Sequence, residues 1–315
     1  MQKAVSTVFG QCFKSKKNEK ILIIYDEKKR KIAEHLFSGG KKFSNHITLL
    51  KIEEPKINGA EPKPQVAEEM LHNDIVLLVT SKSLSHTNAR KAASKKGVRI
   101  ASMPGITEEM VDRTLNADYK KIAALCSKIS KQLNKGKELH ISTAKGTDFY
   151  CTINKKTIKN DNGDLSKKGS FHNLPSGETF FAPLEGSSYG KYIVDLSHAE
   201  IGKLKGDITV NVAEGYAVSI LGGKEGRYLD NMLRNVHNKD AYNIAEVGIG
   251  THYKARVTGS VLEDEKVMGT CHIALGNNYS FGGKINVPVH VDGVIDKPTI
   301  FVDKKCIMKD GKFCI

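Results

Sequence analysis

A histidine and an aspartate stand two residues apart in the segment INVPVHVD, residues 285–292. Because side chains alternate across a strand, the odd-numbered apolar residues of this segment are expected to face a core. His290 and Asp292 then leave the opposite face together, about 7 Å apart along the strand. An imidazole and a carboxylate at this spacing suit a shared metal ion, although an exposed polar strand face gives the same pattern.

Three further segments place one polar side chain among apolar or small residues. His272 lies in TCHIALG, where Thr, Ala and Gly share its expected strand face and leave room beside the ring. A structural core histidine is the alternative. Glu246 lies in IAEVGIG, where a buried carboxylate needs a cation, a donor network or a proton. Glu178 follows a Pro-Ser-Gly turn in FHNLPSGETFFAP.

Two histidines and three carboxylates thus come from four apolar segments that are punctuated by glycine. Carboxylates can bridge two divalent ions, and imidazole favours zinc or cobalt. Two ions about 3.5–4 Å apart promote hydrolysis, because one lowers the pKa of a bridging water while the other polarises the scissile carbonyl. The residue types therefore predict a site with two divalent ions.

The first half of the chain alternates between strand-like and helix-like segments. Short apolar runs at residues 21–25, 46–52, 74–80 and 98–102 indicate strands, and the segments between them indicate helices. This order predicts a doubly wound α/β domain with a mostly parallel sheet. Neither GxGxxG nor GxxxxGK[ST] follows a strand, so a dinucleotide or P-loop site is not expected.

Glycine usage changes after residue 136. Residues 1–136 contain 7 glycines and residues 137–315 contain 21, and short β-prone runs replace the alternation of strands and helices. One helix is expected at residues 227–236. This pattern predicts a largely antiparallel, β-rich α+β C-terminal domain. We therefore expect an α/β domain at 1–136 and a metal-binding catalytic domain at 137–315.

The composition is that of an ordinary globular protein, with 315 residues, 39% of them hydrophobic and 27% charged, and a net charge of +14. The basic runs carry no nucleic-acid-binding motif, so they predict solvated surfaces and no specific nucleic-acid partner. No apolar run is long enough for a membrane helix, and the N-terminus lacks the apolar stretch of a secretory signal. The six cysteines are scattered without a CxxC pair, which favours a cytoplasmic, reducing setting.

Four segments, in order along the chain, resemble the thermophilic metallo-aminopeptidases, the aminopeptidase T and aminopeptidase S family that is often labelled leucyl aminopeptidase. They are NLPSGETFFAP, NIAEVGIG, LEDEKVMGTCHIALGNNYSFGG and HVD, with a weaker match at SLSHTNARKAASKKGVRIASMPGIT. The resemblance covers most of the chain. It implies an α/β domain beside a metal-bearing C-terminal domain, two divalent ions (zinc, cobalt or manganese), a cytoplasmic setting and a homodimer.

Carried over position by position, the resemblance implies a role for each matching side chain. Five of them are expected to bind metal: Glu178, Glu246, His272, His290 and Asp292. Glu265 is expected to act as a general base or to support the ligands, and Tyr279 to donate to an oxyanion. One departure is that the family's DEN stretch reads Asp264, Glu265, Lys266 in this chain.

The expected activity is that of a metallo-aminopeptidase, a hydrolase of the metalloprotease class that releases N-terminal residues from peptides. An alternative is a mononuclear non-haem iron oxygenase, because His272, His290 and Asp292 have the composition of a two-His-one-carboxylate triad. The resemblance implies the dihydroxypyridine type of ring-cleaving dioxygenase for this alternative, since relatives of the family include such an enzyme with the same HxD ending. Glu178 and Glu246 favour the binuclear hydrolase, since the triad does not need them. A catalytically silent metal-binding relative is the third alternative.

Overall fold

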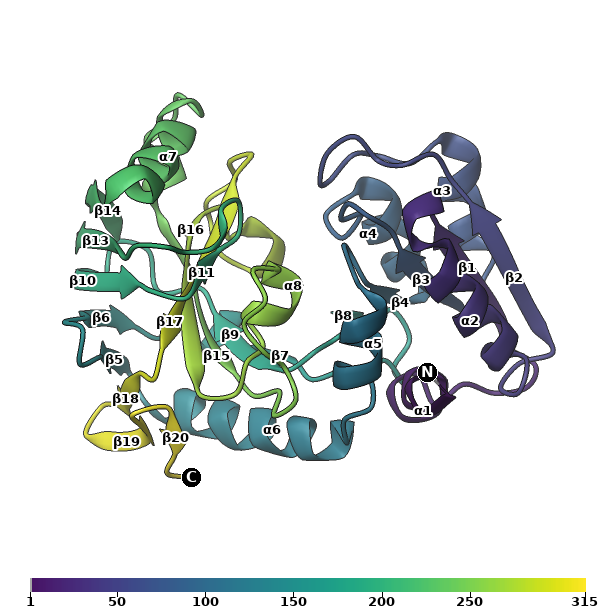
Figure 1. Ribbon diagram of the computed structural model, residues 1–315. Helices are drawn as coiled ribbons and strands as arrows, with labels where there is room; N and C mark the ends of the chain where they lie inside the picture. The colour runs from purple at the N-terminus through teal and green to yellow at the C-terminus, as the bar shows by residue number, and fades with distance from the viewer. Residues whose placement is uncertain (1) are drawn as a thin grey trace. The chain divides into compact units, whose positions relative to one another are not determined.

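The computed structural model describes residues 2–315 and divides the chain into two compact units (Figure 1). The first unit runs to Ala123 and includes Asp161–Ser176, and the second comprises Ala124–Asn160 and Gly177–Ile315. The sequence predicts one boundary at 136/137, which is the end of helix α6 (Tyr119–Lys135). In the structure the division falls inside α6, and Asp161–Ser176 belongs to the first unit because its strand joins the first sheet.

A five-stranded parallel sheet lies at the centre of the first unit, in the order β2-β1-β3-β4-β8. Its strands are β1 (Lys20–Tyr25), β2 (His46–Lys51), β3 (Ile75–Val79), β4 (Arg99–Ser102) and β8 (Phe171–Asn173). Successive residues of β1 and β3 are buried, so both faces of these strands are covered, as in a parallel sheet packed between helices. The predicted α/β class is confirmed.

Helices precede or connect the strands of this sheet, and threonine side chains cap the starts of two of them, α4 and α5. They are α1 (Gln2–Val5), the π-helix η1 (Ser6–Cys12), the 3-10 helix η2 (Glu27–Lys29), α2 (Arg30–Gly40), α3 (Pro64–Leu71), α4 (Asn88–Lys96) and α5 (Glu108–Thr114). At the start of α5, Thr107 Oγ1 accepts a hydrogen bond from the Met110 N–H at 3.1 Å. Gly97 ends α4 with φ at 103°, a conformation that glycine adopts without strain.

Two antiparallel sheets form most of the second unit, as the glycine-rich, β-prone sequence predicts. The eight-stranded sheet has the order β14-β13-β10-β6-β5-β18-β19-β20 and the seven-stranded sheet the order β12-β11-β17-β16-β15-β9-β7. The strands of the first are β5 (Glu138–Ser142), β6 (Asp148–Thr152), β10 (Tyr189–Val194), β13 (Ile208–Ala213), β14 (Tyr216–Leu221), β18 (Thr299–Val302), β19 (Lys305–Lys309) and β20 (Lys312–Phe313). The strands of the second are β7 (Lys159–Asp161), β9 (Glu178–Phe181), β11 (Ser197–His198), β12 (Gly202–Lys203), β15 (Ile244–Gly250), β16 (Thr270–Gly276) and β17 (His290–Asp296).

Short helices accompany these sheets. They are η3 (Lys155–Thr157), α7 (Gly223–Arg234), η4 (Lys239–Tyr242), α8 (Val261–Asp264) and η5 (Tyr279–Phe281). Helix α7 corresponds to the helix predicted at 227–236, with its start four residues earlier. Among residues 2–315, no helix has the length and apolar character needed to span a membrane.

One hydrophobic core contains apolar side chains from both sheets of the second unit. Alternate residues of the central strands contribute to it, among them Val247 of β15, Ile273 of β16 and Val291 of β17. Because side chains alternate, Glu246 and His272, which neighbour these residues in sequence, leave the opposite face. The seven-stranded sheet therefore separates its apolar core from a polar face.

Strand β17 begins later than the sequence predicts. Residues 285–289 lie outside any strand, and asparagine side chains hold their backbone instead. Asn277 Nδ2 donates to the Val287 carbonyl at 2.9 Å, and Asn278 Oδ1 accepts from the Ile285 N–H at 2.9 Å. The expected alternation holds only from His290 onward, so the prediction of one strand over residues 285–292 is wrong at its start.

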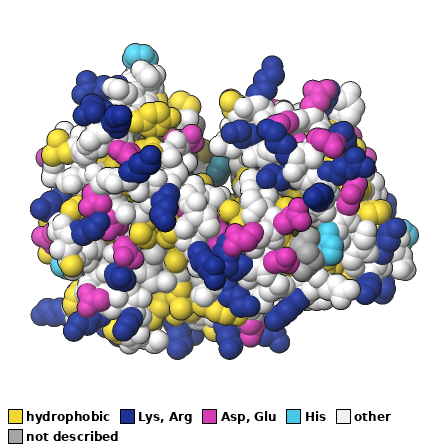
Figure 2. All heavy atoms as spheres, in the orientation of Figure 1, with side chains coloured by type: hydrophobic (Ala, Val, Ile, Leu, Met, Phe, Trp, Pro, Cys, Tyr) yellow, Lys and Arg dark blue, Asp and Glu magenta, His cyan; other side chains and the backbone are white. Residues whose placement is uncertain are grey.

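Basic side chains account for the net charge of +14 without an extended single-sign patch on the visible face. Figure 2 shows Lys and Arg spread over that face and interspersed with Asp and Glu. Several are paired at the surface, such as Lys28 with Glu54 at 2.7 Å and Lys63 with Glu53 at 2.6 Å. Exposed pairs of this kind contribute little to stability.

Candidate metal centre

The site is built on the polar face of strands β9, β15, β16 and β17. His272 of β16 lies directly opposite Gly248 of β15 in the antiparallel register. A Cβ atom at Gly248 would lie 2.1 Å from Cε1 and Nε2 of the His272 ring. Glycine at this position therefore leaves the space in which the imidazole lies across the neighbouring strand.

A small residue also separates the two carboxylates of the central strands. Ala274 of β16 pairs with Glu246 of β15 on one side and with Asp292 of β17 on the other. The methyl group of alanine leaves room for both carboxylates to turn towards the middle strand. All three strands are buried here, with Glu246 6% and Asp292 7% exposed.

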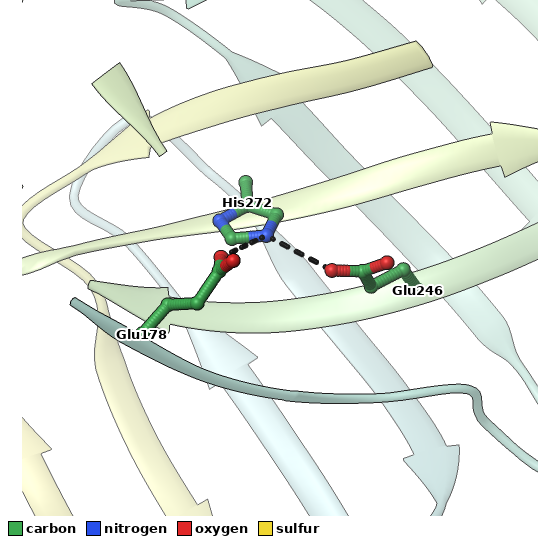
Figure 3. A group of neighbouring side chains, drawn as sticks. All are labelled: Glu178, Glu246 and His272. Atoms are coloured by element: carbon green, nitrogen blue, oxygen red, sulfur yellow. Dashed lines mark hydrogen bonds and ion pairs between the residues drawn. The ribbon is translucent and has the colours of Figure 1, made fainter. Parts of the chain in front are cut away.

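Two carboxylates approach the same nitrogen of His272 (Figure 3). Nε2 lies 3.3 Å from Glu178 Oε2 and 3.4 Å from Glu246 Oε1. Ligand atoms bound to one divalent ion at about 2.0–2.1 Å lie about 2.8–3.0 Å apart in octahedral geometry and about 3.3–3.4 Å apart in tetrahedral geometry. The separations are long for hydrogen bonds and close to the spacing of ligands around a shared ion.

His290 has its orientation fixed by the backbone. Its Nδ1–H donates to the Asn277 carbonyl at 2.7 Å, because a carbonyl oxygen can only accept. Nε2 is therefore left to face the site, 3.5 Å from Glu246 Oε2 and 3.5 Å from Asp292 Oδ1. A ring nitrogen held in this way by a backbone carbonyl is typical of metal-binding histidines.

The ligand atoms form two overlapping groups that share His272. Glu178, Glu246 and His272 make one group, and Glu265, His272 and Asp292 make the other, each with its atoms within 4.8 Å of one another. Among residues 2–315, Glu178 Oε2 is buried without a hydrogen-bond partner. A metal ion bound between this oxygen and the neighbouring imidazole nitrogen would give the buried carboxylate the partner that it lacks. The residues therefore fit a divalent ion.

Opposite charges at close range shift the pKa values of the site strongly. Burial by itself lowers the pKa of His272, but the hydrogen bond to Glu246 and the charge of Glu178 raise it to about 9. Burial likewise disfavours the charged form of His290, and Asp292 outweighs it and raises the pKa to about 10. Burial raises the pKa of Glu178 to about 8, against the lowering effect of Lys266. Because metal-binding imidazoles must be neutral, a metal ion would compete with protons for both rings.

A buried lysine lies within this site, which the sequence analysis noted only as a departure from a motif. Lys266 is 0% exposed, and its Nζ lies 2.5 Å from Glu178 Oε1 and 2.5 Å from Glu265 Oε1. In the sequence LEDEK it resembles an exposed, charged turn. The turn is instead folded inward, because Asp264, also 0% exposed, accepts hydrogen bonds from the backbone N–H groups of Thr258 and Gly259.

The seven residues predicted for the site do not all meet. Six lie together: Glu178, Glu246, Glu265, His272, His290 and Asp292. Tyr279 is 63% exposed on η5, so its phenol does not lie among these buried side chains. Sequence analysis missed Lys266, and it also missed Phe281, whose ring lies edge-to-face against His290 with centroids 6.0 Å apart.

Solved structures show that the fold is shared with two kinds of protein. The structure of 2,5-dihydroxypyridine dioxygenase from Pseudomonas putida KT2440 matches with a TM-score of 0.83 and 17% identity, over 99% of this chain and 96% of that one. AmpT from Thermus thermophilus matches with a TM-score of 0.73 and 15% identity, over 100% of this chain and 98% of that one. The expected two-part fold is confirmed.

Sequence comparison also finds a relative with an assigned activity. The 2,5-dihydroxypyridine 5,6-dioxygenase of Pseudomonas putida KT2440 is 24% identical over 247 residues, which is 75% of this chain and 70% of that protein. Residues 1–315, the whole chain, match the family model described as 2,5-dihydroxypyridine 5,6-dioxygenase. The prediction of a metallo-aminopeptidase, with its hydrolase and protease classes, is therefore wrong, and the resemblance to aminopeptidase T extends only to a related fold. This chain belongs to the 2,5-dihydroxypyridine 5,6-dioxygenase family.

Proposed function

We propose that this protein is a ring-cleaving dioxygenase that opens a dihydroxylated pyridine, or a closely similar aromatic ring, with one iron(II) ion. The observation that carries the proposal is the convergence of two imidazoles and a carboxylate on one sheet face, in a chain of this family. Two histidines and one carboxylate are the ligand set of many non-haem iron oxygenases. The family match favours this oxygenase chemistry over a hydrolytic site built from the same residue types.

His272, His290 and Asp292 are the side chains that we assign to hold the iron. They come from adjacent strands whose register is fixed by seven consecutive pairs, so the three groups are positioned by the most regular part of the sheet. Three protein ligands leave positions open for substrate and dioxygen. When bound, iron(II) supplies the redox chemistry that allows dioxygen to react with an electron-rich ring.

Glu246 is the group that we assign to accept the proton of a ring hydroxyl. Its carboxylate faces both imidazoles, at 3.4 Å from His272 and 3.5 Å from His290, and only 6% of the residue is exposed. A buried carboxylate in this position can accept a proton directly from the hydroxyl group of a substrate ring that binds beside the two histidines. Bulk water is not needed for this transfer. Replacement by glutamine keeps the shape and removes this capacity.

Aromatic side chains beside the site favour a flat, aromatic substrate. Phe281 lies edge-to-face against His290, and also against Phe180 of β9 with ring centroids 5.4 Å apart. Both phenylalanines are partly exposed, so part of each ring remains available for contact. Aromatic rings pack favourably in edge-to-face or offset arrangements, which suits a pyridine ring that binds next to His290.

Oxygen consumption by the iron-loaded full-length chain tests the proposal. Protein reconstituted with iron(II) without air is mixed with 2,5-dihydroxypyridine and dioxygen, and oxygen uptake and loss of the ring absorbance are followed together. We expect stoichiometric uptake, with both atoms of isotopically labelled dioxygen found in the ring-opened product. Glu246→Gln is expected to lose turnover, whereas His72→Ala, on the surface of α3's C-terminal end, is the matched control.

The proposal is overturned if protein that holds one iron per chain consumes no oxygen with this ring or with other dihydroxylated aromatic rings. It is also overturned if the uptake is equal in wild type and His290→Ala, because the assigned ligands would then have no part in the reaction.

A further inference from the structure

Arg90 differs from the other arginines of the first unit because it has no acidic partner. Each of the other three pairs with a glutamate: Arg30 with Glu34 at 2.7 Å, Arg99 with Glu19 at 2.8 Å and Arg113 with Glu109 at 2.8 Å. Among residues 2–315, no carboxylate pairs with Arg90, although its side chain is half-buried. Burial lowers the pKa of its guanidinium to about 10, and no opposite charge offsets this effect. A cation that loses contact with water in this way is costly to keep.

Two neighbours hold the guanidinium of Arg90 in place. Its Nε–H donates to the Ser85 carbonyl at 2.6 Å. Its Cζ lies over the Phe171 ring of β8, 4.2 Å from the ring centroid, which is a favourable cation–π contact. The two terminal nitrogens form no hydrogen bond with any of residues 2–315. The guanidinium is therefore positioned, and the N–H groups of its two terminal nitrogens remain available to a ligand.

A second donor lies near the same serine. The Ser85 hydroxyl oxygen is 2.8 Å from Ser102 Oγ of β4 and 3.4 Å from Asn173 Oδ1 of β8. The Nδ2 group of Asn173 donates to no other side chain or carbonyl within residues 2–315. Ser102 and Asn173 are the last residues of adjacent parallel strands, so the cluster lies at the carboxyl edge of the five-stranded sheet. This is the edge at which open α/β sheets bind their ligands.

We propose that Arg90, with Asn173 beside it, forms a site that binds a small carboxylate. The planar guanidinium matches the two oxygens of a carboxylate and binds them with two parallel hydrogen bonds. One positive charge without a partner balances one negative charge, which favours a monocarboxylate over a phosphate dianion. The ligand supplies the opposite charge that the fold does not provide. All of these residues belong to the first unit, so the site does not depend on the proposed function.

Benzoate binding to the full-length chain tests the proposal. Saturation-transfer NMR follows the benzoate resonances in a titration, with benzamide as the uncharged counterpart and inorganic phosphate as the alternative anion. Wild type is expected to bind benzoate at least about tenfold more tightly than benzamide or phosphate, because only the carboxylate forms two charge-assisted hydrogen bonds with the guanidinium. His290→Ala is titrated in parallel and should bind benzoate as wild type does, which separates this site from the candidate metal centre.

Variants of Arg90 locate the site. Arg90→Met keeps the length of the side chain and removes its charge, so benzoate binding should weaken about tenfold or more. Arg90→Lys keeps the charge but cannot present two parallel N–H groups, so its affinity should lie between those of wild type and Arg90→Met. Arg30→Met is the matched control, because Arg30 is exposed and already pairs with Glu34, and it should bind benzoate as wild type does.

Circular dichroism measures the fold of each variant. Wild type that binds no benzoate, or that binds benzamide or phosphate as tightly, would contradict the proposal. So would wild-type affinity in Arg90→Met, or loss of benzoate binding in His290→Ala. If Arg90→Met does not fold, Arg90→Lys decides the matter, since benzoate affinity equal to that of wild type in this variant would show that the guanidinium does not hold the carboxylate.

Discussion

His290 has one ring nitrogen fixed by a backbone carbonyl and the other directed at two carboxylates, so its imidazole is already oriented for a metal ion. We expect His290→Ala and Asp292→Ala each to weaken iron(II) binding by about a hundredfold or more, since each removes a side chain that is proposed to hold the ion. Bound iron after dialysis measures the effect, and far-ultraviolet circular dichroism measures the fold.

The matched control for this pair is His72→Ala, whose imidazole pairs with Glu68 at the surface. Its iron content should equal that of wild type. Full iron occupancy in both His290→Ala and Asp292→Ala would show that the ion binds elsewhere.

Phe281 affects the substrate through contact, because its ring packs against His290 and Phe180 without bonding to either. We expect Phe281→Leu to raise KM for the dihydroxylated ring about two- to tenfold, the range of an aromatic pair, with a smaller change in kcat. Steady-state oxygen uptake gives both constants. Tyr228→Leu, an exposed aromatic on α7, should leave them unchanged, and an unchanged KM in Phe281→Leu would mean that the ring does not bind there.

Alternation along a strand was enough to predict that the side chains of His290 and Asp292 lie together, because both residues belong to one short segment. Lys266 was beyond such reasoning. Its partner Glu178 is 88 residues away in sequence, and only the pairing of distant strands brings them together. The burial of Lys266 depends on the inward folding of its turn, which local sequence does not specify.

At the scale of elements, the pairing of β15 with β16 sets the position of the His272 ring. We expect Gly248→Ala to displace this ring, because the new methyl group would lie 2.1 Å from two of its atoms. Stability should fall by about 1–3 kcal/mol from overpacking. Turnover should fall about a hundredfold from misplacement of a ligand. Urea unfolding and oxygen uptake measure the two effects.

Gly206→Ala is the matched control for this substitution, since a Cβ at that position meets nothing within 4 Å. Its stability and turnover should be those of wild type. Wild-type turnover in Gly248→Ala would show that the His272 ring is free to move without loss of function.

The start of β17 shows where element prediction fails. The apolar alternation of residues 285–289 predicts a strand, but Pro288 has no N–H, and Asn277 and Asn278 bond to the backbone of this segment. Side-chain competition of this kind depends on residues seven and ten positions earlier in the sequence. The central strands were predicted more successfully, because long apolar runs specify a buried strand on their own.

At the scale of the whole molecule, stability should depend on pH through His198, which is 4% exposed. Burial lowers its pKa to about 4, against a weaker opposing effect of Asp292. A depressed pKa means that the folded state favours the neutral ring. The neutral ring contributes fully to the free energy of unfolding above about pH 6.5, which is the pKa of histidine in the unfolded chain. This contribution is lost as the pH falls from about 6.5 towards 4.

We expect this one group to account for a loss of about 2 kcal/mol in the free energy of unfolding between pH 7 and pH 5. Urea unfolding of wild type and His198→Gln at both pH values measures it, and the variant should show the smaller loss. His72→Gln, at the surface, should behave as wild type. An equal loss in wild type and His198→Gln would contradict the shift.

The prediction of function failed at this same scale. The sequence provides an inventory of imidazoles and carboxylates, and such an inventory serves hydrolysis as well as oxygenation. The two-domain α/β and β-rich architecture could be predicted, since it follows from local periodicity and glycine usage. The reaction could not, because it depends on how distant side chains are assembled around the site, among them Lys266, which local sequence does not place there.

The return of Asp161–Ser176 to the first unit has a consequence for biosynthesis. Strand β8 is translated after β5 and β6, so the first sheet lacks its edge strand while part of the second unit has already left the ribosome. The hairpin β5-β6 must in turn wait for β18, which pairs with β5 much later in the chain. Neither unit can therefore fold strictly in order of synthesis, unlike domains that are completed one after the other. Because Glu178 precedes His290 and Asp292 by more than half of the second unit, the candidate metal site stays incomplete in the nascent chain until these last residues emerge.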